Sequence, residues 1–290
     1  MIYVLHHVTA LLLAIAAAAY LRRARWVPGR PHLAVGLWQI TGLTVVSALV
    51  GGLIALGLAP LRQGVVPGLG SFFAGHLDAG RSTLIIAGLG LAAAVLATQA
   101  VFTVRVARHR ARHRDLLTLV ARRRGEALEL EHGVAVAYCL PGRSPRIVVS
   151  SGARNLLTEA ELQAVLAHEK AHLRGRHHLV LGPFSAVAAA VPWCRRTAAD
   201  IALLVEMCAD DHAARCHGAD TVASALKKFQ RLGTGTPPAG ALAAATGSLG
   251  SRIARLSRPR PAPRRLRVTL ALAVAVTVLA TPLSLYLTPL

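Results

Sequence analysis

Long apolar runs dominate the pattern of hydrophobic and polar positions along this 290-residue chain. A helix needs roughly 20 consecutive apolar residues to cross the hydrocarbon core of a bilayer. Four runs reach that length, at residues 2–21, 33–59, 82–104 and 268–288. We therefore predict three transmembrane helices within residues 1–104 and a fourth within residues 267–290.

Three further segments are told apart by their composition. The apolar run at residues 179–193 is too short for a regular span, so it fits either a re-entrant hairpin that dips into the membrane or a buried helix. Residues 233–251 are rich in Gly, Ala, Thr and Pro, which predicts a loop. Residues 257–265 have the composition of an extended basic tether to the last span.

The distribution of arginine predicts the orientation of the spans, because cytoplasmic loops carry an excess of Lys and Arg. Arginine is frequent after the first run, after the third run and before the fourth, whereas residues 60–81 hold only Arg62 and Arg81. We therefore place both termini outside a bacterial plasma membrane and residues 105–266 in the cytoplasm. No basic segment precedes the first run, which argues against a cleaved signal peptide.

Strand and helix signals precede the short apolar run. Residues 134–138 and 146–150 have the pattern of short strands, and the Pro-Gly-Arg-Ser-Pro segment between them predicts a hairpin. Thr158 and Glu161 form a capping box, followed by apolar residues at helical spacing, which predicts a helix at about 159–174. The predicted fold class is mainly α, with polytopic membrane helices and a cytoplasmic α+β domain that carries a small β-hairpin or sheet.

The predicted helix carries the sequence His168-Glu169-Lys170-Ala171-His172. Histidines four residues apart lie one above the other on a helix face, where a single Zn²⁺ can accept both imidazoles. The intervening Glu169 projects beside them and can accept a proton from an attacking water.

A catalytic zinc usually takes three protein ligands. Glu206 and Asp210 lie four residues apart on a second predicted helix. We predict Glu206 as the third ligand and Asp210 as an acceptor that holds a ligand histidine by its other N–H. The alternative is an ordinary acidic helix face. The clustering of scarce acidic residues, 13 against 33 Lys and Arg, favours the metal site.

Three stretches carry a resemblance to a known class: Leu162 to His178, Val191-Pro192-Trp193, and Glu206-x-x-Ala209-Asp210. They resemble the integral-membrane gluzincin peptidases, most closely the BlaR1/MecR1-type M56 family, whose members regulate β-lactam resistance. The M48 family of HtpX- and Ste24-like peptidases shares the His-Glu-x-x-His and Glu-x-x-Ala-Asp elements. The resemblance implies a gluzincin-type zinc peptidase domain at 105–266. It also implies His168, His172 and Glu206 as zinc ligands, with Glu169 as the general base.

The same resemblance implies a function. We expect a membrane zinc endopeptidase that cleaves a cytoplasmic repressor of the BlaI/MecI type. The alternative is an M48-like quality-control protease with broad membrane-protein substrates. A third alternative, a non-catalytic membrane sensor or scaffold, has no chemical need for Glu169. BlaR1-type sensors carry an extracellular penicillin-binding domain after their last membrane helix. This chain ends at Leu290, soon after its last apolar run, so we do not expect it to sense β-lactams directly.

The remaining composition changes this picture little. The net charge of +20 concentrates beside the predicted spans, where the membrane explains it, so we expect a lipid partner and no direct nucleic acid. The oligomeric state stays open, a homo-oligomer included. Four cysteines without a Cys-x-x-Cys pair are expected to pack as free thiols: Cys139, Cys194, Cys208 and Cys216. Three further histidines either orient substrate or lie at a surface: His177, His178 and His212.

Overall fold

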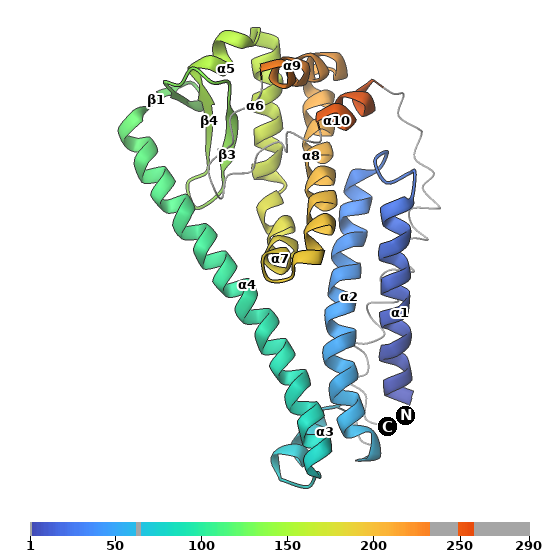
Figure 1. The fold of residues 1–290 in the computed structure, drawn as a ribbon. Helices are drawn as coiled ribbons and strands as arrows, with labels where there is room; N and C mark the ends of the chain where they lie inside the picture. The colour runs from blue at the N-terminus through green and yellow to red at the C-terminus, as the bar shows by residue number, and fades with distance from the viewer. Residues whose placement is uncertain (1, 62–64, 233–248, 258–290) are drawn as a thin grey trace. The chain divides into compact units, whose positions relative to one another are not determined.

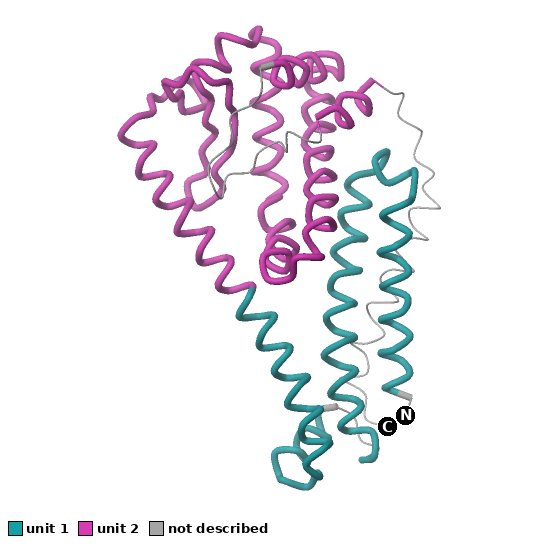
Figure 2. Tube along the Cα trace, viewed as in Figure 1, with its two compact units in different colours: residues 1–98, 262–290 teal, residues 99–261 magenta. Residues whose placement is uncertain are grey.

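The computed structural model describes residues 2–61, 65–232 and 249–257. These residues form two compact units, unit 1 up to residue 98 and unit 2 from residue 99 onward (Figure 2). Most of them are helical, and they include several long apolar helices and one four-stranded sheet (Figure 1). The predicted fold class is confirmed.

Unit 1 is built from apolar helices. They are α1 (Ile2–Arg23), α2 (Pro31–Leu58), the 3₁₀ turn η1 (Ala59–Leu61), α3 (Val65–Phe73) and the first part of α4 (Ala79–Val120). In the described part of the chain, α1, α2 with η1, and α4 are long and apolar enough to cross a membrane. They contain the first three predicted runs, and the run at 268–288 lies outside the described residues.

Small residues let the helices of unit 1 approach one another. Ala10 and Ala14 of α1 and Ala34 of α2 are all buried. Gly57 of α2 faces α4, where an added Cβ would lie 2.9 Å from the main-chain oxygen of Arg81. Glycine and alanine allow this close backbone approach in membrane-type helix pairs, where van der Waals packing replaces the hydrophobic effect.

The sheet of unit 2 contains four short strands in the order β1-β2-β4-β3. They are β1 (Ala121–Arg124), β2 (Ala127–Leu130), β3 (Ala137–Leu140) and β4 (Arg146–Ser150). The pair β3–β4 is antiparallel, which confirms the predicted hairpin, although β3 begins three residues later than expected. The pair β1–β2 was not predicted because its exposed arginines hide the strand pattern.

Seven helical segments accompany this sheet. They are α5 (Ser151–Leu156), α6 (Glu159–Arg174), α7 (His177–Ala190), η2 (Pro192–Cys194), α8 (Arg195–His217), α9 (Ala219–Leu232) and α10 (Leu249–Leu256). The loop predicted at 233–251 is therefore wrong at its end, because Leu249 begins a helix. Residues 233–248 and the predicted tether from residue 258 lie outside the described part of the chain.

Helix α6 forms as predicted, at residues 159–174, and it is the centre of unit 2. Its capping box is present: Thr158 Oγ1 accepts from the Glu161 amide, and Glu161 Oε2 accepts from the Thr158 amide at 2.8 Å. Leu162 and Leu166, one turn apart, share a buried apolar cluster with strand residues such as Val149. A second apolar cluster joins Ala164 and Ala167 of the same helix to α8, α9 and α10. These two contacts fix the rotation of α6, so that His168 and His172 face α8.

Candidate metal centre

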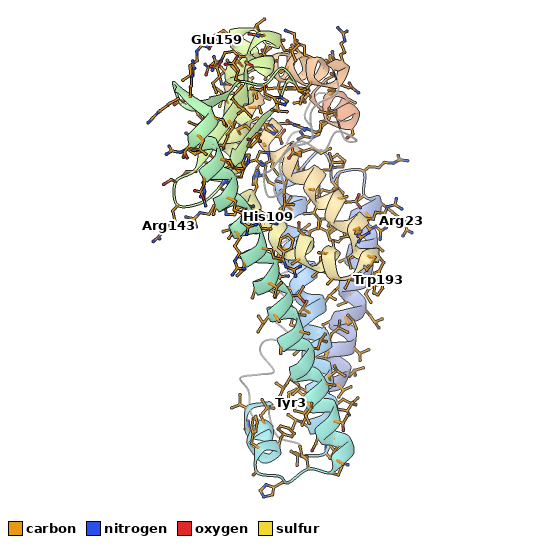
Figure 3. The ribbon with its side chains drawn as sticks, turned by 60° about the vertical axis from the view of Figure 1, so that its left-hand side comes forward. Tyr3, Arg23, His109, Arg143, Glu159 and Trp193 are labelled. Atoms are coloured by element: carbon orange, nitrogen blue, oxygen red, sulfur yellow. The ribbon has the colours of Figure 1, made fainter. Side chains whose placement is uncertain are left out.

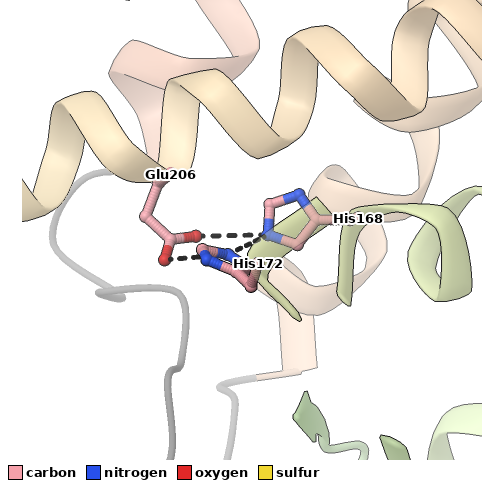
Figure 4. A group of neighbouring side chains, drawn as sticks. All are labelled: His168, His172 and Glu206. Carbon is pink, nitrogen blue, oxygen red and sulfur yellow. Dashed lines mark hydrogen bonds and ion pairs between the residues drawn. The ribbon is translucent and has the colours of Figure 1, made fainter. Parts of the chain in front are cut away.

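Two histidines of α6 and a carboxylate of α8 meet in the interior of unit 2 (Figure 4). His168 Nε2 lies 3.3 Å from Glu206 Oε2, and His172 Nε2 lies 3.4 Å from Glu206 Oε1. The two Nε2 atoms are 3.1 Å apart. All three residues are buried. The structure thus brings together the three residues predicted as ligands.

These distances suit a divalent metal ion. Two nitrogens held tetrahedrally at the usual Zn–N length of about 2.0–2.1 Å would be about 3.3 Å apart. The three observed separations, 3.1, 3.3 and 3.4 Å, lie close to this tetrahedral edge. Among the described residues, Glu206 Oε2 has ion-pair contacts with His168 and Arg252 but no hydrogen bond, so it keeps a buried lone pair for a metal. The donor set and its spacing therefore fit zinc.

Asp210 lies where the sequence places it, behind His168, one of the two histidines predicted as ligands. Its Oδ1 is 3.1 Å from His168 Nδ1, and the carboxylate is fully buried. An acceptor at Nδ1 fixes the tautomer of His168 and leaves the Nε2 lone pair free for a metal. The i,i+4 spacing of Glu206 and Asp210 on α8 directs one carboxylate at the centre and the other at the back of His168.

Arg252 of α10 completes this side of the centre, and the sequence analysis missed it. Its Nε and Nη2 donate to the two oxygens of Asp210 at 2.8 and 2.6 Å. Its Nη1 lies 3.1 Å from Glu206 Oε2 as an ion pair. The guanidinium is 1% exposed, which is rare unless the charge is paired. Its sequence signal is the Arg-Ile-x-x-Leu pattern of a short amphipathic helix, and Arg252 lies 42 residues after Asp210, too far for a local pattern to pair them.

His177 contacts His172, the other histidine predicted as a ligand. Its Nδ1 lies 2.9 Å from His172 Nδ1, and both rings are buried. The sequence left His177 between a substrate contact and a surface position, and the structure buries it against His172 instead. His212 is not part of this group: its Nε2 faces Cys216 Sγ at 4.0 Å, near the end of α8.

Glu169 is buried beside the two histidines, and one of its carboxylate oxygens is open to a further hydrogen bond. Its Oε2 has no hydrogen-bond partner in the described part of the chain. The thiol of Cys139, on β3, hydrogen-bonds to the carboxyl group. Burial raises the pKa of Glu169 above its usual range, against the attraction of His168 and His172. A carboxylate whose pKa is raised in this way is suited to accept a proton and release it again.

The charges of the centre call for a cation. Burial opposes the charged form of His168, but Asp210 and Glu206 outweigh it and raise the pKa of His168 to about 10. Burial also opposes the charge of Glu206, yet His172 and Arg252 hold the pKa of this carboxyl well below its usual range. Histidines must be neutral to bind a metal. In that state the three carboxylates Glu169, Glu206 and Asp210 and the guanidinium of Arg252 carry a total charge of −2, which Zn²⁺ would neutralise.

Fold and centre together define a class: a mainly helical protein with membrane-type helices and a buried His-His-Glu group of the kind found in zinc peptidases. Residues 108–191 match the model of Peptidase family M48. The matched segment contains His168, Glu169 and His172 and ends before Glu206. No curated protein and no solved structure matches the chain. The match supports a likeness to membrane metallopeptidases, and it does not confirm the resemblance to the M56 family.

Proposed function

We propose that this protein is a membrane-anchored zinc endopeptidase. One observation carries the proposal: His168, His172 and Glu206 lie at the edge lengths of a zinc tetrahedron, with an unpartnered oxygen of Glu169 beside them. The match of residues 108–191 to Peptidase family M48 supports the same activity.

Each residue of the centre has a distinct role in the proposed reaction. His168, His172 and Glu206 would hold Zn²⁺, which supplies Lewis acidity at the peptide carbonyl and makes the attacking water more acidic. Glu169 accepts the proton of that water through its free oxygen and passes it to the leaving amine. Its raised pKa assists the second transfer. Asp210 and Arg252 keep His168 and Glu206 in place.

Strand β3 offers a place for the substrate backbone. It is one of the two edge strands of the sheet, and it lies beside α6 in Figure 1. Cys139 of β3 touches Glu169, so this edge reaches the centre itself. An extended peptide added to a sheet edge is held by main-chain hydrogen bonds, which suits a protease with little specificity for side chains.

The proposal extends to the side of the membrane that unit 2 faces and to the class of substrate. We propose that unit 2 faces the cytoplasm, because the arginine-rich loops flank it in sequence. In that location a BlaI/MecI-like repressor is within reach. The match to Peptidase family M48 favours the second candidate, a quality-control protease with broad substrates. A proteome-wide comparison of cleavage products separates them: one or a few repressor fragments favour regulation, and many membrane-protein fragments favour quality control.

The decisive experiment compares the purified full-length protein with its Glu169→Gln variant. We expect both to hold one zinc per chain by metal analysis, because Glu169 is not a ligand. We expect the variant to lose about 10²–10⁴-fold in peptide turnover, because the amide cannot accept a proton. Unchanged turnover in Glu169→Gln, or wild-type protein without zinc, contradicts the proposal. A cleavage assay with the same peptide plus a chelator serves as the control for contaminating proteases.

A further inference from the structure

The surface of α7 is apolar and exposed. No charged residue occurs between residues 179 and 194. Leu179 is 58% and Trp193 83% exposed, and Pro183 and Ala190 are exposed as well. At 3.6 residues per turn, Leu179, Pro183 and Ala190 lie within about 40° of one another around the helix. We call Leu179, Pro183, Ala190 and Trp193 the α7 surface. Figure 3 shows Trp193 projecting from its helix turn.

One hydrogen bond joins α7 to the third predicted span. Gln99 Nε2 of α4 donates to the main-chain oxygen of Pro183 at 3.1 Å. Gln99 lies within the uncharged run 82–104, six residues or about 9 Å of helix before Arg105. A polar side chain inside a span needs a protein partner, since the hydrocarbon core offers none. The Pro183 turn of α7 therefore lies at the depth of Gln99.

Basic residues mark both ends of this apolar stretch. Arg176 precedes α7, and Arg195 and Arg196 open α8, all with exposed side chains. The 14 residues of α7 measure about 21 Å, well short of the roughly 30 Å of a hydrocarbon core. Tryptophan and arginine are both favoured at the headgroup level. Both ends of the segment thus belong to one face of the membrane.

We propose that α7 is a re-entrant helix, which lies beside α4 and inserts the α7 surface into the bilayer from the side that holds the metal centre. Anionic headgroups bind Arg176, Arg195 and Arg196. The insertion keeps α6 and α8 on the same side of the membrane, as a shared metal site requires. It also brings the centre close to the headgroups, because His177, the first residue of α7, contacts His172. Insertion of α7 does not depend on whether the centre is catalytic.

Fluorescence of Trp193 tests the insertion. The variant Trp26→Phe/Trp38→Phe leaves Trp193 as the sole tryptophan. In vesicles of phosphatidylcholine and phosphatidylglycerol, we expect nitroxide-labelled lipid to quench its emission strongly and aqueous iodide to quench it weakly. The control adds Trp193→Phe and Arg215→Trp, which moves the probe to an exposed position of α8; iodide should now quench and the lipid should not. Quenching of Trp193 by iodide alone overturns the proposal, as does protection from both quenchers, which would indicate a protein partner.

A second probe guards against loss of folding in the tryptophan variants. A nitroxide attached at Leu179→Cys, in a Cys194→Ser/Cys216→Ser background, reports its depth by its access to oxygen against a water-soluble nickel complex. The remaining thiols, Cys139 and Cys208, are buried. We expect oxygen access to dominate at residue 179 and nickel access to dominate for the same label at Arg215→Cys. Equal nickel access at the two positions contradicts insertion.

Discussion

Units 1 and 2 are both built mainly from packed helices, but they differ in the polar and charged side chains that they bury. Among the described residues of unit 1, the buried polar side chains are His7, Thr41 and Thr44, and none is a carboxylate. The described residues of unit 2 include five buried carboxylates and one buried guanidinium: Glu161, Glu169, Glu206, Asp210, Asp211 and Arg252. Burying a charge costs free energy unless the charge is paired. Unit 2 therefore accepts the free-energy cost of buried charges, several of which form its candidate metal centre, whereas unit 1 is packed for close helix contact.

The largest effect should follow from removing the carboxylate of α8 that faces the histidines. We expect Glu206→Ala to lose stoichiometric zinc and with it all peptide turnover, since one of three ligands is gone. Metal analysis of the purified protein measures this. Asp211→Ala is the matched control, because Asp211 is also buried on α8 but pairs with Arg255 at 2.7 Å, away from the ligands. Full zinc in Glu206→Ala would rule out Glu206 as a ligand.

Replacement of Arg252 tests whether the buried charges depend on one another. Arg252→Met leaves Asp210 and Glu206 buried without their cation, so we expect a loss of about 3–5 kcal/mol in unfolding free energy. The control Arg255→Met should lose less, because Arg255 and Asp211 are 12% and 10% exposed and water replaces part of the pair. Thermal unfolding in detergent, with chelator present, compares the two variants. Equal losses would show that α10 contributes only by packing.

The sequence revealed some parts of the candidate metal centre better than others. The capping box and the approximate bounds of helix α6 were predicted, because the cap, the apolar spacing and the His-Glu-x-x-His motif all fall within one local stretch. Asp210 was also found, because its distance from Glu206 is set by one helix turn. Arg252 and His177 were not assigned. Arg252 comes from α10, a separate helix, and its role depends on tertiary packing. His177 turns back onto His172 because Arg176 adopts a left-handed conformation with φ 46°, which no local pattern predicts.

Acid should reveal the contribution of Glu161, a buried carboxylate outside the centre. Burial opposes ionisation of Glu161, but Lys228, Ser224 and Thr158 outweigh it and lower the pKa to about 2. Because this folded-state pKa is depressed, the contribution is complete above about pH 4.5 and is lost as the pH falls towards 2. We expect Glu161→Gln to be less stable than wild type by up to about 3 kcal/mol at pH 7, with the gap closing below pH 4.5. Thermal midpoints with chelator, from pH 7 to pH 3, measure it. A gap independent of pH would show that the loss is steric.

Asp210, which contacts His168, and His177, which contacts His172, should differ in their effect on zinc affinity. Asp210→Asn should weaken zinc affinity by about 10–100-fold without abolishing it, as loss of a carboxylate behind a ligand usually does. His177→Ala should cost less, about 10-fold at most, because a neutral imidazole polarises His172 less than a carboxylate does. Competition with a zinc chelator measures both, and His177→Asp should restore the affinity. If Asp210→Asn lost all zinc, Asp210 would be a ligand itself.

The smallest effect should come from unit 1, where packing decides. An added Cβ at Gly88 of α4 would lie 2.9 Å from Ile54 Cγ1 and 3.2 Å from the main-chain oxygen of Val50, both on α2. We therefore expect Gly88→Ala to push α2 and α4 apart and to lower stability by about 1–2 kcal/mol. Gly90, two residues along the same helix, has nothing within 4 Å of its added Cβ. Gly90→Ala should be neutral or slightly stabilising, because alanine is the better helix former. Thermal unfolding in detergent compares the pair, and both variants should keep full zinc, because neither residue belongs to unit 2. Zinc loss in Gly88→Ala would contradict the division of roles between the two units.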